Sequence, residues 1–295
     1  EKGKLDFIGM TAEQFIKKAK GRRWGKSAFK VKYANKGAKG YGFMGMNLKD
    51  PLFKSRKTRL ALYHLVNRKL MIEKFRYGMD LPATGPWYQQ SEYADPSVSP
   101  VGFDTKKALK LLREDGWKDS DGDRILDKKI DGKLVKFSFT ILEPRKEFEK
   151  YLTVFKEDAK KAGIEAKIKV VEWNTFIKLL NERKFQVVRL GWSGGSVNID
   201  PKQIWHSSSI AGGGSNFVGY NNPKVDKWID EARMILNKDK RKELLRQVYR
   251  QIAFDVPYIF FFNSKFGFYG HTKKMSRQKD TYNYGVGLDY WWIKK

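Results

Sequence analysis

The sequence predicts an α/β fold, in which strands alternate with helices. Two observations lead to this prediction. Between residues 135 and 191, short runs typical of strands are separated by segments whose apolar residues recur at helical spacing. Gly163 stands where one of those helices would end, as Gly116 does for an earlier predicted helix. Alternation of this kind favours helices layered on a sheet over a helical bundle, and 295 residues with 41% hydrophobic content can bury one large domain or two.

The first part of the chain predicts a strand, a long helix and an irregular loop. The segment Tyr41–Asn47 alternates as a strand does. Apolar residues recur at roughly helical spacing from Lys54 to Arg76, and Gly78 follows as a C-terminal cap, so we expect one long helix there. The stretch 81–100 is rich in proline and carries aromatic residues, which indicates a loop ordered by packing.

The remaining elements follow from capping residues, helical spacing and apolar runs. In chain order they are a helix from a cap at Asp104 to Asp115, a strand Val135–Leu142, a helix Lys146–Ala162, a strand Ala166–Val171, a helix from Asn174, a strand Phe185–Gly191, helices Pro223–Leu236 and Lys238–Asp255, and a strand Pro257–Phe262.

Composition limits the classes of function. A formal charge of +27 raises nucleic acid, anionic membranes and acidic ligands as partners. Lys and Arg are interleaved with Glu and Asp along most helices, which favours a solvated basic surface, and a basic nucleic-acid-binding protein is kept as the alternative function. The absence of cysteine excludes disulfide frameworks and cysteine-based zinc sites, and the longest apolar run, 256–262, is too short to cross a bilayer.

Two enzyme-like motifs lack the context that their chemistry needs. The run Gly191–Gly195 matches the elbow that displays a nucleophilic serine, here Ser193, but a loop follows where the elbow requires a helix. Three glycines at 212–214 are not followed by the Lys and Ser or Thr of a phosphate-binding loop. His206 precedes three serines, and we expect no serine–histidine pair there because neighbours in sequence rarely point together. No catalytic residue is therefore predicted.

One acidic segment has the alternation of a calcium loop. Carboxylates at alternate positions can converge on Ca²⁺, but Arg124 and Ile130 stand where an EF-hand has its glycine and its bidentate glutamate. The alternative is a turn held by side-chain to backbone hydrogen bonds. No cofactor is expected apart from a possible structural calcium ion, and its candidate ligands are Asp119, Asp121, Asp123 and Asp127.

The segment from Gly191 to Tyr220 is the expected ligand-facing wall. Trp192 and Tyr220 flank loops rich in glycine, serine and asparagine. A concave binding site needs this combination of apolar walls and hydrogen-bonding groups.

Four stretches of the sequence carry a resemblance to a known family. They are Gly45–Phe53 running into Arg59–Arg68, Ala108–Trp117 followed by Asp119–Asp123, Leu190–Trp192 through Asp200–Pro201, and Tyr220–Pro223 with Val225–Asp226. In these stretches the chain resembles the bacterial extracellular solute-binding proteins of family 5, the dipeptide, oligopeptide and nickel group that feeds ABC transporters. Glu1–Phe7 resembles a stretch from the middle of such proteins, which implies that the amino-terminal half is absent.

The resemblance implies a periplasmic binding protein fold of type II, with one complete α/β lobe and strands of a second. Residues 1–47 would be a remnant of the first lobe, 48–263 the complete second lobe, and 264–295 the return to the first. The implied function is reversible capture of an oligopeptide or peptide-like solute and its delivery to an inner-membrane permease, by a periplasmic or otherwise extracytoplasmic monomer that is not an enzyme and binds no nucleic acid.

The resemblance also suggests which residues meet the ligand. Peptide-binding relatives carry an aspartate three residues after the tryptophan, where this chain has Gly195, so Asp200 is the candidate replacement. The segments Asp200–Ser208 and Asp289–Trp292 are similar to the branch for long or modified peptides, including murein-type peptides. The expected ligand-binding residues are Trp192, Ser193, Gly194, Gly195, Asp200, Asn216 and Tyr220.

Overall fold

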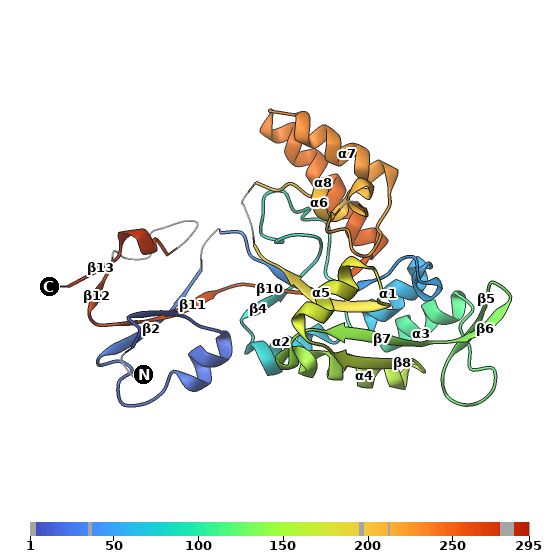
Figure 1. Ribbon diagram of the computed structural model, residues 1–295, viewed down its shortest axis with the longest axis horizontal. Coiled ribbons are helices and arrows are strands. Elements are labelled where there is room, and N and C mark those ends of the chain that lie inside the picture. The colour runs from blue at the N-terminus through green and yellow to red at the C-terminus, as the bar shows by residue number, and fades with distance from the viewer. Residues whose placement is uncertain (1–3, 35–36, 195–197, 212, 278–285, 295) are drawn as a thin grey trace.

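The computed structural model describes residues 4–34, 37–194, 198–211, 213–277 and 286–294. It contains two units, each built on its own sheet, which lie side by side along the long axis of the molecule (Figure 1). Both chain termini lie in the smaller unit. Among the described residues, no helix combines the length and the apolarity needed to cross a lipid bilayer.

The larger unit is built on a mixed sheet of six strands. Strand β7 runs parallel to both β8 and β9, whereas β3 is antiparallel to β9 and β10 is antiparallel to β3 and β4. This mixture of parallel strands, crossover helices and antiparallel edge strands confirms the predicted α/β class. In spatial order the strands are β4 (Asp80–Pro82), β10 (Tyr258–Ser264), β3 (Tyr41–Met46), β9 (Val187–Trp192), β7 (Ser138–Glu143) and β8 (Glu165–Val170).

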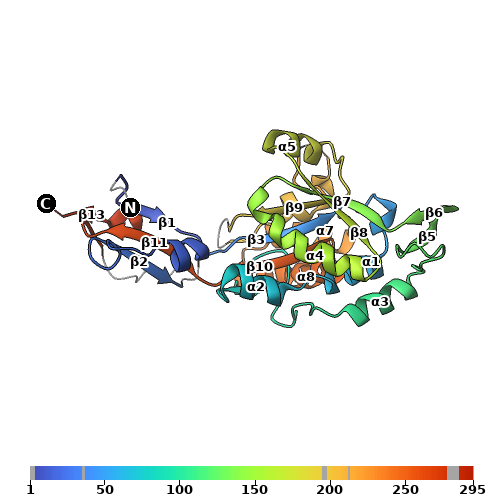
Figure 2. The same ribbon diagram turned by 90° about the horizontal axis from the view of Figure 1, so that it is seen from below.

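Helices cover this sheet. Tyr151 of α4 packs on Phe262, while Trp205 of α6 packs on Tyr258 and Phe260. Helices α6, α7 and α8 stand together on the upper side in Figure 1, and α4 crosses in front of the strands when the molecule is seen from below (Figure 2). The helices are α1 (Arg56–His64), α2 (Arg68–Arg76), α3 (Thr105–Glu114), α4 (Glu149–Lys161), α5 (Trp173–Asn181), α6 (Lys202–Trp205), α7 (Pro223–Met234) and α8 (Lys238–Asp255), with short turns at Pro51–Phe53, Lys146–Phe148, Ser207–Ser209 and Leu288–Tyr290.

The single long helix predicted over Lys54–Arg76 is wrong, because two helices occupy this segment. Between them Asn67 leaves the helical conformation, and its side-chain oxygen accepts a hydrogen bond from the Leu70 amide as the N-cap of α2. The predicted strand Val135–Leu142 is also divided. Its first part belongs to a hairpin of β5 (Asp127–Ile130) and β6 (Lys133–Lys136), and β7 begins only at Ser138.

The smaller unit is an antiparallel sheet of three strands from both ends of the chain. Strand β11 (Gly267–Thr272) pairs with β1 (Phe7–Gly9) on one side and with β2 (Ala28–Tyr33) on the other. A π-helix at Gln14–Lys18 and a short pairing of β12 (Met275–Ser276) with β13 (Trp292–Ile293) complete it.

Sheet membership corrects one predicted domain boundary. The boundary after residue 47 lies too late, because β3 is an inner strand of the six-stranded sheet, and the change of unit falls between Tyr33 and Tyr41. The other predicted boundary, after residue 263, coincides with the end of β10 at Ser264. The chain therefore crosses between the units twice, once before β3 and once after β10.

Candidate ligand-binding site

A cavity lies at the end of the six-stranded sheet where the chain crosses to the smaller unit. It has a volume of about 600 Å³. Segments far apart in the sequence line it, at 38–41, at 86–92, and at 192–194 with 198–205. The predicted residues Trp192, Ser193, Gly194 and Asp200 are among its walls, and Gly195 lies outside the described residues.

Trp192 closes one side of this cavity as part of an aromatic stack. Its ring lies 6.2 Å from that of Phe43 and 6.0 Å from that of Phe217, with interplanar angles of 17° and 8°. Phe43 in turn stacks on Tyr258 with 3.8 Å between ring centroids. The Trp192 ring is therefore held between two other aromatic rings.

The glycines next to Trp192 permit close contact between two backbones. A Cβ atom added to Gly194 would lie 2.0 Å from the carbonyl oxygen of Ala38, and one added to Gly40 would lie 2.2 Å from the carbonyl oxygen of Trp192. Segments 38–40 and 192–194 thus continue the β3–β9 pairing beyond the strands. Any side chain at these positions would push the two walls of the cavity apart.

Asp200 lies at the cavity with its carboxylate already in use. One oxygen accepts a hydrogen bond from the Lys202 amide, and the other lies 3.1 Å from Nε of Arg233. The ion pair is weak because the two side chains are 51% and 45% exposed. A ligand amine can therefore compete with Arg233 for this carboxylate.

Asn216 and Tyr220 do not reach the cavity, which contradicts the predicted ligand contacts of both. Asn216 is fully buried, donates to the carbonyls of His206 and Tyr220, and accepts from the Tyr220 amide. The Tyr220 hydroxyl donates to Asp255 at 2.6 Å, and burial raises its pKa. Its ring meets Trp205 edge-on, so the two residues support a cavity wall from behind.

The loop 86–92 supplies residues that the sequence prediction missed. Trp87 packs edge-on against Tyr249 at 5.2 Å, and Gly85 lets the loop lie close over that ring. The indole N–H of Trp87 is buried and has no acceptor among the described residues. The Trp87 side chain lines the cavity, whereas its N–H is not exposed there. The proline-rich, aromatic composition of 81–100 was the signal, although it could not show that this loop faces β9.

A second cavity, of about 320 Å³, opens beside the first and carries three arginines. Alternation along β9 places Arg189 and Trp192 on opposite faces of the sheet. Arg189 therefore points into the second cavity, together with Arg76 and Arg145. Because the cavity lies at the carboxyl ends of the parallel strands β7 and β9, it occupies the position where open α/β sheets bind ligands.

Arg189 is buried beside a carboxylate that does not fully neutralise it. Its guanidinium lies 3.5 Å above the Phe148 ring, and its Nε is 3.7 Å from Oε2 of Glu143. Neither of these two atoms has a hydrogen-bond partner among the described residues. Burial raises the pKa of Glu143 to about 7, against the opposing pull of Arg189. Near neutral pH the pocket is therefore an electropositive site with Arg189 only partly compensated.

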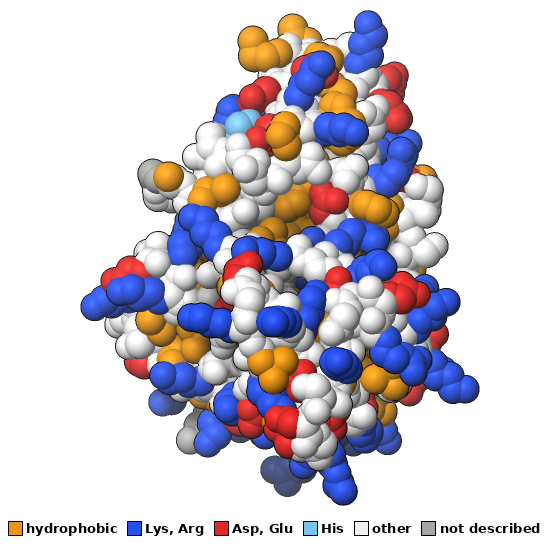
Figure 3. All heavy atoms as spheres, turned by 90° about the vertical axis from the view of Figure 1, so that its right-hand side faces the viewer, with side chains coloured by type: hydrophobic (Ala, Val, Ile, Leu, Met, Phe, Trp, Pro, Cys, Tyr) orange, Lys and Arg blue, Asp and Glu red, His pale blue; other side chains and the backbone are white. Residues whose placement is uncertain are grey.

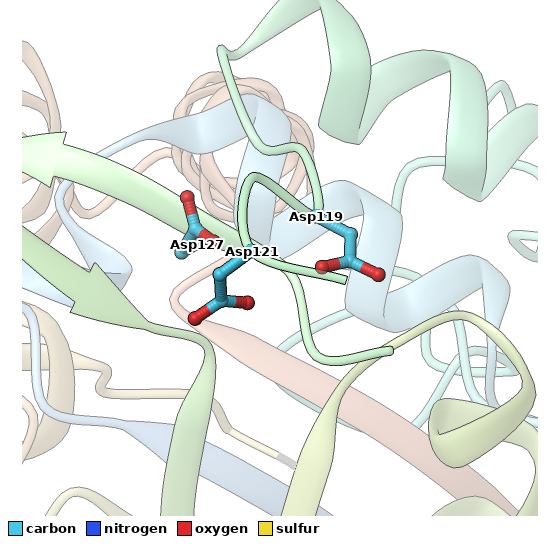
Figure 4. A group of neighbouring side chains, drawn as sticks. All are labelled: Asp119, Asp121 and Asp127. Atoms are coloured by element: carbon cyan, nitrogen blue, oxygen red, sulfur yellow. The ribbon is translucent and has the colours of Figure 1, made fainter. Parts of the chain in front are cut away.

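The acidic loop after α3 brings its carboxylates together (Figure 4). Carboxylate oxygens of Asp119, Asp121 and Asp127 lie within 4.8 Å of one another, so these residues could hold a metal ion. The ammonium of Lys136, from β6, lies 2.6 Å from Asp121 and 2.9 Å from Asp123. A divalent cation would have to displace this lysine.

Hydrogen bonds within the same loop support the alternative prediction of an aspartate-rich turn. Asp119 accepts from the amides of Gly122 and Arg124, and Asp127 accepts from the amide and hydroxyl of Ser120. The turn is thus held by side-chain to backbone contacts that need no metal.

The expectation that His206 makes no serine pair is wrong. Ser208 Oγ lies 2.8 Å from Nδ1 of His206, and Nε2 lies 3.1 Å from Asp230. The same Nδ1 also accepts the Ser208 amide, because His206 caps the short turn Ser207–Ser209. The imidazole thus serves as a helix cap.

Comparisons with known proteins agree with the fold. A model of the family described as bacterial extracellular solute-binding proteins, family 5 Middle, matches residues 1–216. The chain belongs to this family. Ser193, in the elbow-like motif, lines the cavity described above.

Among its relatives, this family 5 chain is 35% identical over 265 residues to the oligopeptide-binding protein AppA of Bacillus subtilis, covering 86% of the chain and 47% of AppA. The structure of that AppA with a nonapeptide superposes with a TM-score of 0.83 at 30% identity, covering 99% of this chain and 57% of AppA. NikZ of Campylobacter jejuni, solved with Ni(L-His), has a TM-score of 0.80 at 21% identity, covering 99% of this chain and 58% of NikZ, and shows the shared fold alone. The chain thus spans about half the length of these relatives.

Proposed function

We propose that the protein is the substrate-binding component of an ABC importer, which reversibly captures an oligopeptide or peptide-like solute. The observation that supports this most directly is the cavity of about 600 Å³ between the six-stranded sheet and the crossing segments, walled by aromatic rings and by glycine backbone. A peptide offers repeating amide groups and varied side chains, and such walls combine apolar area with a few hydrogen-bonding groups.

The two cavities together suggest how a peptide would lie. Tyr41 lines both, so they adjoin at the amino end of β3. In this proposal the chain of the ligand crosses Trp192 and Trp87, a positive group meets Asp200, and an anionic group meets Arg189.

The double crossing between units supports a two-lobe clamp. We propose that the six-stranded unit is the complete second lobe and that the three-stranded sheet belongs to the first. The ligand would be held at their junction and passed to a permease in the inner membrane. We further propose that the protein works outside the cytoplasmic membrane, as a monomer that binds no nucleic acid. On the face shown in Figure 3, Lys and Arg are interspersed with Asp and Glu, as expected of a solvated surface.

Titration calorimetry with peptides from dipeptides to nonapeptides tests the proposal. We expect heat of binding for at least one length class, and a loss of affinity of about tenfold for Trp192→Ala, because an aromatic wall is removed. Leu134→Ala on the distant β5–β6 hairpin is the matched control and should bind normally. Absence of binding to every peptide, together with steeply salt-dependent affinity for DNA or RNA, would replace the proposal by the nucleic-acid alternative.

A further inference from the structure

The hairpin of α7 and α8 ends in an apolar tip that the rest of the molecule leaves uncovered. Two of its side chains, Met234 and Leu236, are 84% and 98% exposed. The sequence predicts that α7 runs to Leu236, but the helix ends at Met234 because Ile235 takes an extended conformation with φ −89° and ψ 120°. This early end turns Leu236 away from the buried face of the hairpin and into solvent.

The tip projects from the larger unit near the rim of the ligand cavity, since Arg233 and Arg241 on either side of it contact Asp200 and Ile199. Helix α8 has 18 residues and is about 27 Å long, and its carboxyl end leads into β10 inside the larger unit. The connection between the helices therefore lies at the far end, where α7 and α8 project from the body in Figure 1. Figure 3 shows hydrophobic side chains at this upper extremity, close to Lys and Arg.

Cations surround the two apolar side chains. Residues 230–242 carry five basic and three acidic groups. The acidic groups are already paired, since Asp239 contacts Lys242 at 2.8 Å and Glu231 contacts Lys227 at 3.8 Å. Lys238 and Lys240 are exposed and make no ion pair with any described residue. The surface around Met234 and Leu236 is therefore electropositive.

We propose that this tip, Met234 to Lys240, is a contact site for the surface of an anionic lipid bilayer. The two aliphatic side chains form a convex protrusion. Their surface area is far smaller than the roughly 800 Å² that each partner buries in a stable protein interface. A bilayer interface needs no complementary groove, because it accepts apolar groups at the depth of the acyl boundary and binds lysines at its anionic headgroups. The anionic headgroups match the basic residues around the tip. The apolar boundary beneath the headgroups matches Met234 and Leu236.

Co-sedimentation of the full chain with vesicles tests the proposal. We expect binding to vesicles of phosphatidylcholine mixed with phosphatidylglycerol and little binding to phosphatidylcholine alone. Met234→Ser with Leu236→Ser should lower the partition coefficient by about tenfold, and Lys238→Gln with Lys240→Gln should lower it further at low salt. Leu134→Ser is the control, because Leu134 is also exposed, at 60%, but lies on the β5–β6 hairpin. The substituted side chains lie in water, so folding, checked by circular dichroism, should be preserved.

The absence of cysteine allows a second, local readout. A polarity-sensitive fluorophore on Leu236→Cys should shift to the blue on addition of anionic vesicles, and the same label on Leu134→Cys should not. Equal vesicle binding by the wild type and the Met234/Leu236 double variant would overturn the proposal, since the overall charge of +27 would then suffice. Failure of the wild type to bind anionic vesicles would also overturn the proposal. If the wild type self-associates and the Met234/Leu236 double variant does not, the tip would instead be a contact site for a protein partner.

Discussion

The ammonium nitrogen of Lys136 lies 2.6 Å from both carboxylate oxygens of Asp121, in the center of an acidic loop. It also lies 3.6 Å from the buried Asp127. These carboxylates raise the pKa of Lys136, and its hydrogen bond lowers the pKa of Asp123. The lysine thus supplies from within the chain the positive charge that a bound cation would bring.

Replacing this lysine should create a calcium-responsive protein. Without the ammonium, Lys136→Met leaves three carboxylates within 4.8 Å of one another, an arrangement that Ca²⁺ favours. We expect the variant to melt at a lower temperature than the wild type and to regain roughly 5 °C when calcium is added, because a ligand that binds only the folded state stabilises it. Thermal melting with calcium and with chelator measures this, and Lys133→Met on the same hairpin is the control. A wild-type melting temperature that rises with calcium would show that the ion displaces Lys136.

Asp200 should contribute to the recognition of a free amine. A hydrogen-bonded charge contact contributes about 1.5–3 kcal/mol, so Asp200→Asn should raise the Kd of a peptide with a free amino terminus about tenfold or more. Conversely, Arg233→Gln should lower that Kd, since it releases the carboxylate from its 3.1 Å ion pair. Calorimetry with a peptide and its N-acetylated form separates the effects. If Asp200→Asn weakens both forms equally, the amine contact is contradicted. Asp131→Asn, in the turn between β5 and β6, is the control.

How far the sequence predicts this site depends on which contacts are local. The bounds Lys238–Asp255 of α8 are predicted to the residue, because its signals lie within the helix. By contrast, Arg189 lies in a strand that the sequence predicts, yet its importance arises from Glu143 on a neighbouring strand. No local pattern shows that two residues so far apart in the chain share a buried pocket.

Asn216 illustrates a different limit of prediction from the sequence. A loop rich in glycine and serine indicates hydrogen bonding, but composition cannot distinguish an asparagine that bonds a ligand from one that bonds its own loop. The long helix predicted over Lys54–Arg76 failed for a similar reason. Helical spacing continues through the break, and only the N-cap contact of Asn67 shows that the chain turns.

The pair of Glu143 and Arg189 should make both stability and anion binding depend on pH. The folded-state pKa of Glu143, about 7, lies above the ordinary value of 4.5, so the folded protein holds a proton that the unfolded chain releases. Stability from this group is therefore greatest below about pH 4.5 and is lost as pH rises through 7. Glu143→Gln should remove this dependence, as urea unfolding across that range would show.

The same titration should weaken anionic ligands at higher pH. Once Glu143 ionises, it neutralises Arg189, and a ligand carboxylate loses part of its attraction to the pocket. We expect the Kd of a peptide with a free carboxyl terminus to increase several-fold between pH 6 and 8, roughly the interval that brackets a pKa of about 7. An amidated peptide and the Glu143→Gln variant should both show a flat profile. A slope that persists in Glu143→Gln would assign the titration to another group.

Substitution of Asn216 distinguishes a structural role from ligand contact. Asn216→Ala leaves the carbonyls of His206 and Tyr220 and the Tyr220 amide without their partner in a fully buried place. Each unsatisfied buried group costs about 1–3 kcal/mol, so for three groups we expect a loss of about 3 kcal/mol or more in the free energy of unfolding. Urea denaturation measures this, and the exposed Asn221→Ala should change little. Peptide affinity of the folded variant should stay within about twofold of wild type, because small backbone shifts behind Trp205 alter the cavity only slightly. Unchanged stability with lost affinity would instead return Asn216 to the ligand-binding residues.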